Sequence, residues 1–387
     1  MRFIFSSEQE AWRQEVISFI EEELDVRLQA GADAFGSCYE AAIEFRKKLG
    51  QKKWIGIGWP KEYGGIGASA VMQCIFHDEM IYHHAPLDAQ AYHLGPVLIK
   101  YGSEYLKKKF IAGTASQEIT WCQGFSEPNA GSDLANLGTY AIASGDDYVI
   151  NGSKIWTSMA HKADWIHILV RTDTNAPKHK GISYFIVDMK HPGITIAPLV
   201  DMSNDHHFNQ VFFENVRVPK INMIGEKNMG WYVATTTLDH ERSGIQYIAR
   251  SRRILDDILK TMHSLEAVRG IRRDAIAIHK VADMRIQLSV SRKLSYRVAW
   301  LQDQGFEHNR EASIAKVFAT ELLQRVGRVG IEITGFYGHL LADDRRAPNS
   351  GLIPYISLRS VSGTIAAGTS EINRNIIATR GLGLPKG

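Results

Sequence analysis

The spacing of hydrophobic residues predicts that the chain begins with a helix. Apolar residues recur every three or four positions and would share one helical face: Trp12, Val16, Phe19, Ile20 and Leu24. Just before them, Ser7 and Glu10 fit the Ser-x-x-Glu pattern of a capping box, which satisfies free N–H groups at a helix start. Helical segments continue to about residue 118, with a turn expected at 59–69 because WPKEYGGIGAS contains a proline and paired glycines.

A different pattern follows, in which short runs rich in β-branched and aromatic residues are separated by turn residues. We expect strands within the runs 165–170, 182–187, 194–196 and 211–213. The dipeptide Asn151-Gly152 lies between two further runs, YVI and SKIWTS, and predicts a hairpin turn. Strands without intervening helices indicate a small barrel or sandwich of roughly 100 residues.

Helical periodicity returns at Met229 and persists almost to the end of the sequence. The order of helices, strands and helices predicts an α+β multidomain fold with three parts. These are an N-terminal helical domain at 1–119, a middle β-domain at 120–228 and a C-terminal helical domain at 229–387. A chain of 387 residues with 44% hydrophobic content can bury the cores that such domains need.

Composition and charge narrow the expected partners. Lys and Arg number 45 against 42 Asp and Glu, so the net charge of +3 gives no general attraction to nucleic acid or to an anionic membrane. No run reaches the roughly 18 apolar residues of a membrane span, and the charged N-terminal segment does not fit a signal peptide. Three cysteines without a Cys-x-x-Cys pair favour a reducing, cytoplasmic location. The adjacent pairs His83-His84 and His206-His207 lack companion ligands, so no metal site is expected.

Five motifs follow one another along most of the chain: WCQGFSEPNAGSD (121–133), NGSKIWTSMAHKADW (151–165), FENVRVP (213–219), LDHERSG (238–244) and GTSEINRNIIATRGLG (368–383). Together with the N-terminal FSSEQEAWRQEV, they resemble the acyl-CoA dehydrogenase family. The resemblance implies an N-terminal helical domain, a middle β-barrel domain and a C-terminal four-helix bundle, with FAD between the last two. It also implies an acyl-CoA substrate, a tetramer, and electron transfer from the flavin to an electron-transferring flavoprotein.

The resemblance also assigns residues to the two ligands. It places nine residues beside FAD: Gln123, Phe125, Ser126, Trp156, Thr157, Ser158, Thr369, Ser370 and Glu371. It places four residues at the substrate: Ser132, Asp239, Arg242 and Gly368. Hydroxyl and N–H groups suit the charge that a reduced flavin gains at N1 and its C2 carbonyl, and an aromatic wall shields the ring. The alternative interpretation is a polar loop at SEPNAGSD, a core aromatic at Trp156 and a surface ion pair between Asp239 and Arg242.

Dehydrogenation requires a carboxylate that removes the substrate α-proton, and the position where many members carry it is occupied by Ala367. Other members carry the glutamate in a Leu-Asp-x-Glu-Arg segment of the C-terminal domain. This chain has Leu-Asp-His-Glu-Arg at 238–242, so the resemblance implies that Glu241 is the catalytic base. The methyl group of Ala367 leaves space where other members have a long side chain, so we expect a branched, alicyclic or otherwise bulky acyl group.

Helical spacing supports the same residue. On one continuous helix, Glu241 would share its face with four apolar residues: Ala234, Leu238, Ile245 and Ile248. Burial among them would raise the pKa of a carboxyl group toward the pH at which a general base works well. The alternative is a glutamate that pairs with a buried arginine from another helix.

Two segments that reach the FAD of a neighbouring subunit in this family are altered here. SLEAVRGIRRDAIAIHK lacks the usual Arg-x-x-Phe-Gly, although Arg269, Arg272 or Arg273 offers a substitute for the arginine. In GIEITGFYG, Glu332 replaces a usual Gln and Phe336 a usual Gly, so charge and bulk both oppose a pyrophosphate. The pattern is like that of heterotetrameric members with one FAD site per unlike pair. A homotetramer with an altered FAD grip is the alternative.

The sequence therefore predicts an FAD-dependent α,β-dehydrogenase of a bulky acyl-CoA thioester. Two alternatives stay open. One is another flavoenzyme on the same fold, such as a monooxygenase or an oxidase. The other is a non-catalytic partner subunit of a heteromeric acyl-CoA dehydrogenase.

Overall fold

The chain forms two compact units. The computed structural model describes residues 4–28, 38–240, 243–269, 274–342 and 344–385, with the backbone alone at 236–240 and 264–269. The helical unit comprises 1–45, 68–87 and 242–387, and the sheet unit comprises 46–67 and 88–241. Two helices that are neighbours in sequence, α3 (Ala70–Tyr82) and α4 (Ala89–Tyr101), belong to different units, so the units do not follow the linear order of the chain.

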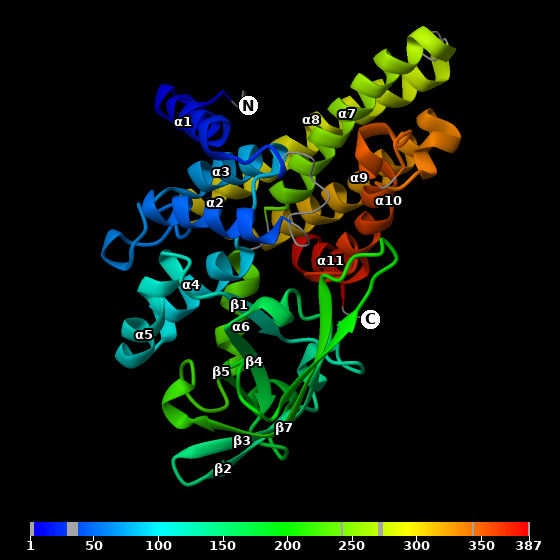
Figure 1. Cartoon of the computed structure of the whole chain (residues 1–387). Coiled ribbons are helices and arrows are strands. Elements are labelled where there is room, and N and C mark those ends of the chain that lie inside the picture. Colours follow the sequence, from blue (N-terminus) through cyan, green and yellow to red (C-terminus); the bar gives the residue numbers. More distant parts are fainter. Residues whose placement is uncertain (1–3, 29–37, 241–242, 270–273, 343, 386–387) are drawn as a thin grey trace. The chain divides into compact units, whose positions relative to one another are not determined.

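The sheet unit contains one curled sheet of seven strands (Figure 1). The strands are β1 (Trp121–Gly124), β2 (Tyr140–Ser144), β3 (Asp147–Lys154), β4 (Trp165–Arg171), β5 (Ile182–Asp188), β6 (Ile194–Leu199) and β7 (Phe208–Pro219). Their spatial order is β1-β4-β2-β3-β7-β6, and β5 also pairs with β4. The predicted strand runs are confirmed.

Alternate residues of β4 and β5 face two different cores. On one side, Leu169 and Tyr184 pack with residues of three helices: α4 (Ala89–Tyr101), α5 (Glu104–Ala115) and α6 (Gly230–His240). On the other side, Ile168 and Phe185 pack with residues of β3 and β7. Successive side chains of a strand point to opposite faces, so strands covered on both faces read as continuous apolar runs.

The dipeptide Asn151-Gly152 does not form the predicted hairpin turn. Strand β3 runs through it with a register shift against β7, and the β2–β3 turn lies at Gly145-Asp146 instead. Gly152 has φ +137°, and a Cβ there would lie 2.6 Å from Thr139 Oγ1. A β-bulge, which needs a glycine here, has overridden the local turn preference.

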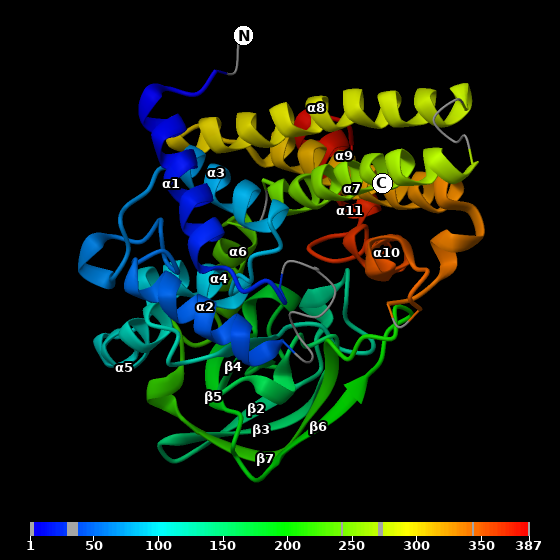
Figure 2. The same cartoon turned by 45° about the horizontal axis from the view of Figure 1, so that its top comes forward.

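The C-terminal helices of the helical unit pack around α9 (Figure 2). Its helices are α1 (Ser7–Glu23), α3 (Ala70–Tyr82), α7 (Ile245–Arg269), α8 (Ala275–Asp303), α9 (Asn309–Thr334), α10 (Leu352–Gly363) and α11 (Ser370–Ile376), and α2 (Tyr39–Gln51) contributes to both units. Helices α7, α8, α10 and α11 each contact α9. None of the helices in the described part of the chain is both long and apolar enough to cross a membrane.

Helix α1 confirms the predicted N-terminal helix, but its cap lies one residue earlier. Ser6 Oγ accepts the N–H of Gln9 at 3.2 Å, and Gln9 Oε1 accepts the N–H of Ser6 at 3.0 Å. The capping box is therefore formed by Ser6 and Gln9 rather than by Ser7 and Glu10. Both pairs fit the pattern because Ser-Ser and Gln-Glu are adjacent in the sequence. The predicted apolar face is confirmed as buried.

Candidate functional site

Two of the three predicted FAD segments lie side by side in the sheet unit. Gln123 is on β1, and Phe125 and Ser126 follow the strand directly. Ser126 O accepts the N–H of Ile155 at 2.9 Å, which joins this segment to the one that contains Trp156. The segments that follow β1 and β3 therefore run side by side.

A buried ion pair ties the same two segments together. The fully buried Lys154 donates to Glu127 Oε1 at 2.7 Å and to Phe125 O at 3.2 Å. Glu127 also accepts the N–H groups of Gly138 at 2.6 Å and Thr139 at 2.9 Å. Burial alone would raise the pKa of Glu127, but the charge of Lys154 and these hydrogen bonds hold that pKa below its ordinary value. Glu127 is thus a structural anchor of the loop.

We expect Glu127→Gln to lower the free energy of unfolding by about 1.5–3 kcal/mol at pH 6, because Lys154 loses its charged partner. Burial already lowers the pKa of Lys154 to about 8, and loss of Glu127 would lower it further. In the variant, Lys154 therefore loses its proton at a lower pH than in the wild type. The loss in free energy of unfolding relative to the wild type should shrink between pH 6 and pH 8. Urea unfolding at both pH values measures the deficit, and a constant value would contradict a buried charge as its cause.

Phe125 packs against a buried histidine. Its ring centroid lies 5.7 Å from those of His167 and Tyr184. His167 Nε2 lies 3.1 Å from Gln90 Oε1, and its Nδ1 lies 2.5 Å from Tyr184 OH. An amide oxygen can only accept, so Nε2–H donates to Gln90 and Nδ1 accepts from the tyrosine. Burial lowers the pKa of His167 to about 3, so the ring is neutral.

His167 should make the stability of the protein sensitive to mild acid. Its pKa in the folded chain lies below the ordinary 6.5, so the unfolded chain binds the proton first as the pH falls. The free energy of unfolding should therefore decrease by roughly 1 kcal/mol per pH unit below pH 6.5 from this residue alone. Urea unfolding at pH 6.5 and 5 should show a smaller decrease in His167→Gln than in the wild type. Equal decreases would mean that other groups cause the acid sensitivity.

Trp156 presents an aromatic surface from a constrained backbone. The residue is 58% exposed, and its φ of +59° is rare for a bulky side chain. Its ring packs edge-on against Phe208, with centroids 5.8 Å apart. The next residue, Thr157, is fully buried, and its Oγ1 has no hydrogen-bond partner within the described part of the chain. An exposed ring beside an unsatisfied hydroxyl indicates a ligand surface rather than a core position.

The third predicted FAD segment lies in the helical unit, where a loop leads into α11. Thr369 caps this helix, because its Oγ1 accepts the N–H of Ile372 at 3.2 Å. Ser370 is buried, and its Oγ lacks a hydrogen-bond partner among the residues that the structure describes. Glu371 is exposed, and its own backbone N–H followed by the Thr369 hydroxyl holds its pKa below the ordinary value.

The loop that precedes Thr369 is fixed by a buried lysine. Gly368 O accepts from Lys316 Nζ at 2.7 Å and from Asn373 Nδ2 at 2.8 Å. Burial lowers the pKa of Lys316 to about 8. The chain bends through two successive left-handed residues, Ala367 at φ +52° and Gly368 at φ +84°. At this bend Ala367 is exposed and offers only a methyl group.

The structure leaves three predicted site residues without a side-chain position. Glu241 and Arg242 lie outside the described residues, and Asp239 is described by its backbone alone near the end of α6. Ser132 is exposed in the loop between β1 and β2. The assignments of these four residues stay predictions.

The helix expected to run through Glu241 is divided. Helix α6 ends at His240, and Gly244 has φ +70° just before α7 begins at Ile245. A left-handed residue interrupts the helical phase, so positions on either side of Gly244 do not share one face. The predicted continuous helix through Ile245 and Ile248 is therefore wrong, although both isoleucines are buried as expected. Glu241 itself lies outside the described residues, so its place on an apolar face stays a prediction.

Comparisons with known proteins cover the whole of this architecture. Three segments match acyl-CoA dehydrogenase domains: the N-terminal domain over residues 6–118, the middle domain over 122–216 and the C-terminal domain over 228–382. Acyl-CoA dehydrogenase FadE29 of Mycobacterium tuberculosis is 36% identical over 373 residues, which are 94% of this chain and 92% of that protein. The chain belongs to the acyl-CoA dehydrogenase family.

Solved structures of acyl-CoA dehydrogenases confirm the predicted three-part fold. The Tcur3481-Tcur3483 steroid ACAD matches with a TM-score of 0.89 and 32% identity over 100% of both chains. The ChsE4-ChsE5 complex from Mycobacterium tuberculosis matches with a TM-score of 0.91 and 31% identity over 100% of both chains. Glutaryl-coenzyme A dehydrogenase in its glutaryl-CoA complex matches with a TM-score of 0.84 and 25% identity over 100% and 98% of the chains.

FAD is the cofactor of acyl-CoA dehydrogenases, and the described residues fit it. The sheet unit offers the exposed ring of Trp156 and the unpaired hydroxyl of Thr157. The helical unit offers the unpaired hydroxyl of Ser370. A buried hydroxyl without a partner costs free energy, which a polar ligand atom would recover. This member of the acyl-CoA dehydrogenase family is thus an FAD-dependent oxidoreductase.

The two altered segments meet through an ion pair in the helical unit. Lys280 Nζ on α8 lies 2.5 Å from Glu332 Oε2 on α9. The predicted repulsion between Glu332 and a pyrophosphate is therefore reduced by a neighbouring cation. Phe336, which follows α9, is 92% exposed. Of the possible substitute arginines, Arg269 is described by its backbone alone, while Arg272 and Arg273 lie outside the described residues.

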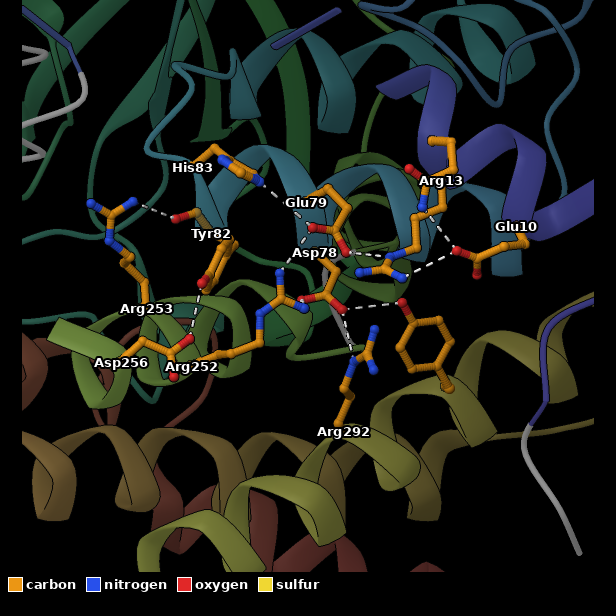
Figure 3. Close-up of polar contacts among 12 residues, drawn as sticks. Glu10, Arg13, Asp78, Glu79, Tyr82, His83, Arg252, Arg253, Asp256 and Arg292 are labelled. Atoms are coloured by element: carbon orange, nitrogen blue, oxygen red, sulfur yellow. Dashed lines mark hydrogen bonds and ion pairs between the residues drawn. The ribbon is translucent and has the colours of Figure 1, made fainter. Parts of the chain in front are cut away.

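A second set of charged residues in this acyl-CoA dehydrogenase has a structural role (Figure 3). Asp78 and Glu79 of α3 are 0% and 2% exposed, and Arg252 of α7 contacts both of them at 3.2 and 3.0 Å. Arg292 and Arg13 add one further contact each, to Asp78 and Glu79 respectively. All oxygens of the two carboxylates thus face cations. Within the described ranges, no three His, Cys, Asp or Glu side chains are arranged to hold a metal ion.

Proposed function

We propose that this protein catalyses α,β-dehydrogenation of an acyl-CoA thioester with Glu241 as the base. The observation that carries the proposal is Leu-Asp-His-Glu-Arg at 238–242 combined with the methyl group of Ala367. A carboxylate is present at one of the two base positions of the family and absent from the other. Glu241 takes the α-proton, and FAD, when bound, supplies the acceptor for the hydride that leaves the β-carbon.

The acyl group that this site accepts is bulky and ring-bearing. Ala367 presents a methyl group on an exposed bend, which leaves room beside the reacting carbons. One structural neighbour carries the name steroid ACAD, which supports a ring-bearing substrate. At the other end of the substrate, Arg242 and Asp239 contact coenzyme A. Ser132 contacts the thioester, and Gly368 also binds the substrate. The planar fork of an arginine suits a phosphate-bearing ligand.

Anaerobic flavin bleaching tests the reaction and the substrate class together. The FAD-loaded protein is mixed with matched series of straight-chain, branched, alicyclic and steroid-derived acyl-CoA thioesters. We expect rapid loss of the flavin absorption with ring-bearing thioesters and slow or incomplete loss with straight chains. Bleaching by straight chains alone would contradict the proposed acyl pocket, and no bleaching by any thioester would contradict the proposed reaction.

Electrons then pass to an electron-transferring flavoprotein in the cytoplasm. Family membership supports this acceptor, and a sequence with three cysteines and no Cys-x-x-Cys pair supports a reducing location. The bleached protein should be reoxidised by an electron-transferring flavoprotein and only slowly by air. Fast reoxidation by air would favour an oxidase instead.

The protein assembles as a heterotetramer with a related subunit. Apolar side chains are exposed along α8 and beyond the end of α9: Ile276, Ile278, Ile286, Val290, Trp300 and Phe336. Exposed apolar rows of this kind mark protein interfaces. The names of two structural neighbours, ChsE4-ChsE5 and Tcur3481-Tcur3483, pair two proteins in one assembly. The altered FAD segments add a reason for an unlike partner, which would supply the missing contacts.

Co-expression with a subunit that carries Arg-x-x-Phe-Gly tests this assembly. We expect a complex with about one FAD per unlike pair and weak FAD binding by this chain alone, because a ligand and the assembly it completes stabilise each other. A homotetramer with one tightly held FAD in every subunit would overturn the heteromeric proposal. Flavin bleaching in the complex that survives Glu241→Gln would instead identify this chain as the non-catalytic subunit.

A further inference from the structure

Two histidines without a predicted functional role converge on one buried amide. His161 lies in the short turn Ala160–Lys162, and His206 precedes β7. Their rings stack with centroids 4.3 Å apart and an interplanar angle of 19°. His161 Nδ1 lies 3.3 Å and His206 Nε2 2.9 Å from Oδ1 of Asn209, which is fully buried.

The orientation of the Asn209 amide determines what the histidines do. Its Nδ2 donates to Thr157 O at 3.1 Å, so its oxygen must be the atom that faces the two rings. An amide oxygen can only accept, and each imidazole therefore donates one N–H to it. One nitrogen of each ring therefore donates to the same oxygen. We call this arrangement of His161, His206 and Asn209 the bracket. In it the two nitrogens are hydrogen-bond donors and not metal ligands.

Through this amide, the bracket reaches the segment that bears Trp156. The backbones of Thr157 and Asn209 also exchange hydrogen bonds at 3.0 and 3.1 Å, so Asn209 makes three hydrogen bonds to Thr157. Phe208, the neighbour of Asn209, packs edge-on against Trp156. A left-handed φ at a tryptophan is unfavourable and persists only where surrounding contacts impose it.

We infer that His161 and His206 are positioning residues for the FAD-facing segment Trp156–Ser158, and that they act through Asn209. The inference rests on the proposed placement of Trp156 against the flavin. Neither histidine needs to touch FAD for this role. Their two N–H groups hold the Asn209 amide in one orientation, and that amide holds the backbone from which the ring of Trp156 and the hydroxyl of Thr157 project.

Matched substitutions distinguish the effect of losing the hydrogen bond to Asn209 from the effect of losing the imidazole ring. An asparagine amide can replace a donor at Nδ1, and a glutamine amide can replace a donor at Nε2. His161→Asn and His206→Gln therefore keep the donor to Asn209, whereas His161→Leu and His206→Leu remove it at similar size. His206 is exposed, so its replacement should not prevent folding, and circular dichroism checks this for all four variants.

Two measurements follow these variants. The first uses the full chain without FAD and records acrylamide quenching of the Trp156 fluorescence, obtained by subtracting the signal of Trp156→Phe because the chain has eight tryptophans. The second measures FAD affinity and the visible absorption of bound FAD, in the complex with the partner subunit where binding requires it. We expect the leucine variants to bind FAD about five- to tenfold more weakly, with a shifted flavin spectrum and an altered quenching constant. The asparagine and glutamine variants should resemble the wild type.

Wild-type values in both leucine variants would overturn the inference, as would equal changes in all four variants, because ring size rather than the donor would then matter. Trp156→Phe separates this failure from that of the proposed FAD site. If Trp156→Phe alters the flavin spectrum and the leucine variants do not, the placement of Trp156 stands and the bracket is refuted. If Trp156→Phe also leaves the spectrum unchanged, the placement itself is wrong.

Discussion

Glu241→Gln is expected to keep the fold and the bound FAD but to slow flavin reduction by about 100- to 10,000-fold. The amide of glutamine has nearly the shape of the carboxylate and should leave substrate binding largely intact. It cannot accept the α-proton, however, and Ala367 offers no second base at the other position. The expected loss therefore lies in the chemical step rather than in the affinity for the thioester.

Stopped-flow reduction by a thioester that bleaches the wild-type flavin measures this step directly. Glu226→Gln is the matched control, because it makes the same change at an exposed glutamate just before α6. The control should reduce its flavin at the wild-type rate. Near-normal reduction in Glu241→Gln would remove Glu241 as the base and would favour a non-catalytic role for this chain.

The fold could be predicted where one periodic pattern extends over a whole element. Helix α1 buries the residues that its spacing selects, and β4 and β5 coincide with two apolar runs. Both strands are covered on two faces, so nearly every residue is apolar and the signal is strong. These elements lie in segments whose local preference and tertiary environment agree.

Prediction failed where a single residue changes the backbone direction. Asn151-Gly152 has the composition of a hairpin turn, yet Gly152 forms a bulge within β3 because of its contact with Thr139 and its pairing with β7. Gly244 similarly ends the helical phase between α6 and α7. A local pattern cannot distinguish a glycine tolerated in a helix from one that adopts a left-handed conformation.

The candidate site was predicted by motif, whereas the residues that hold it in place were not. Lys154, Lys316 and Asn209 each support a predicted FAD or substrate segment through hydrogen bonds to residues far away in the sequence. For Lys316, the sequence did contain a signal of such a supporting role, because this lysine lies within an apolar helix face. Its partner, the carbonyl of Gly368, carries no signal in the sequence, because every residue has a carbonyl.

Arg252→Leu should be among the most destabilising single substitutions in the helical unit, with an expected loss of about 3–5 kcal/mol in the free energy of unfolding at pH 7. Among the residues that the structure describes, Arg252 is the one that forms ion pairs with both Asp78 and Glu79, and these carboxylates are buried. Leucine would fill part of the space but leave two adjacent negative charges with fewer cations. Arg285→Leu is the matched control, since it breaks an ion pair with Asp256 in which the arginine is half-exposed. Such a pair contributes about 1 kcal/mol or less.

The pH dependence of the Arg252→Leu deficit identifies its cause. In the wild type, burial would raise the pKa of Glu79, but Arg252 and Arg13 together hold it below its ordinary value. A carboxyl with a depressed pKa stabilises the folded chain above its unfolded pKa, and that stability is lost as the pH falls through the folded value. Without Arg252 the pKa of the Glu79 carboxyl rises, so the variant can neutralise this buried charge at mild acid. The wild type loses part of the stability that its ionised Glu79 provides over the same pH range. The deficit measured by urea unfolding should therefore be smaller at pH 4.5 than at pH 7. An equal deficit at both pH values would attribute the loss to packing, above all to the contact of the Arg252 guanidinium with the ring of Tyr82 at 4.0 Å.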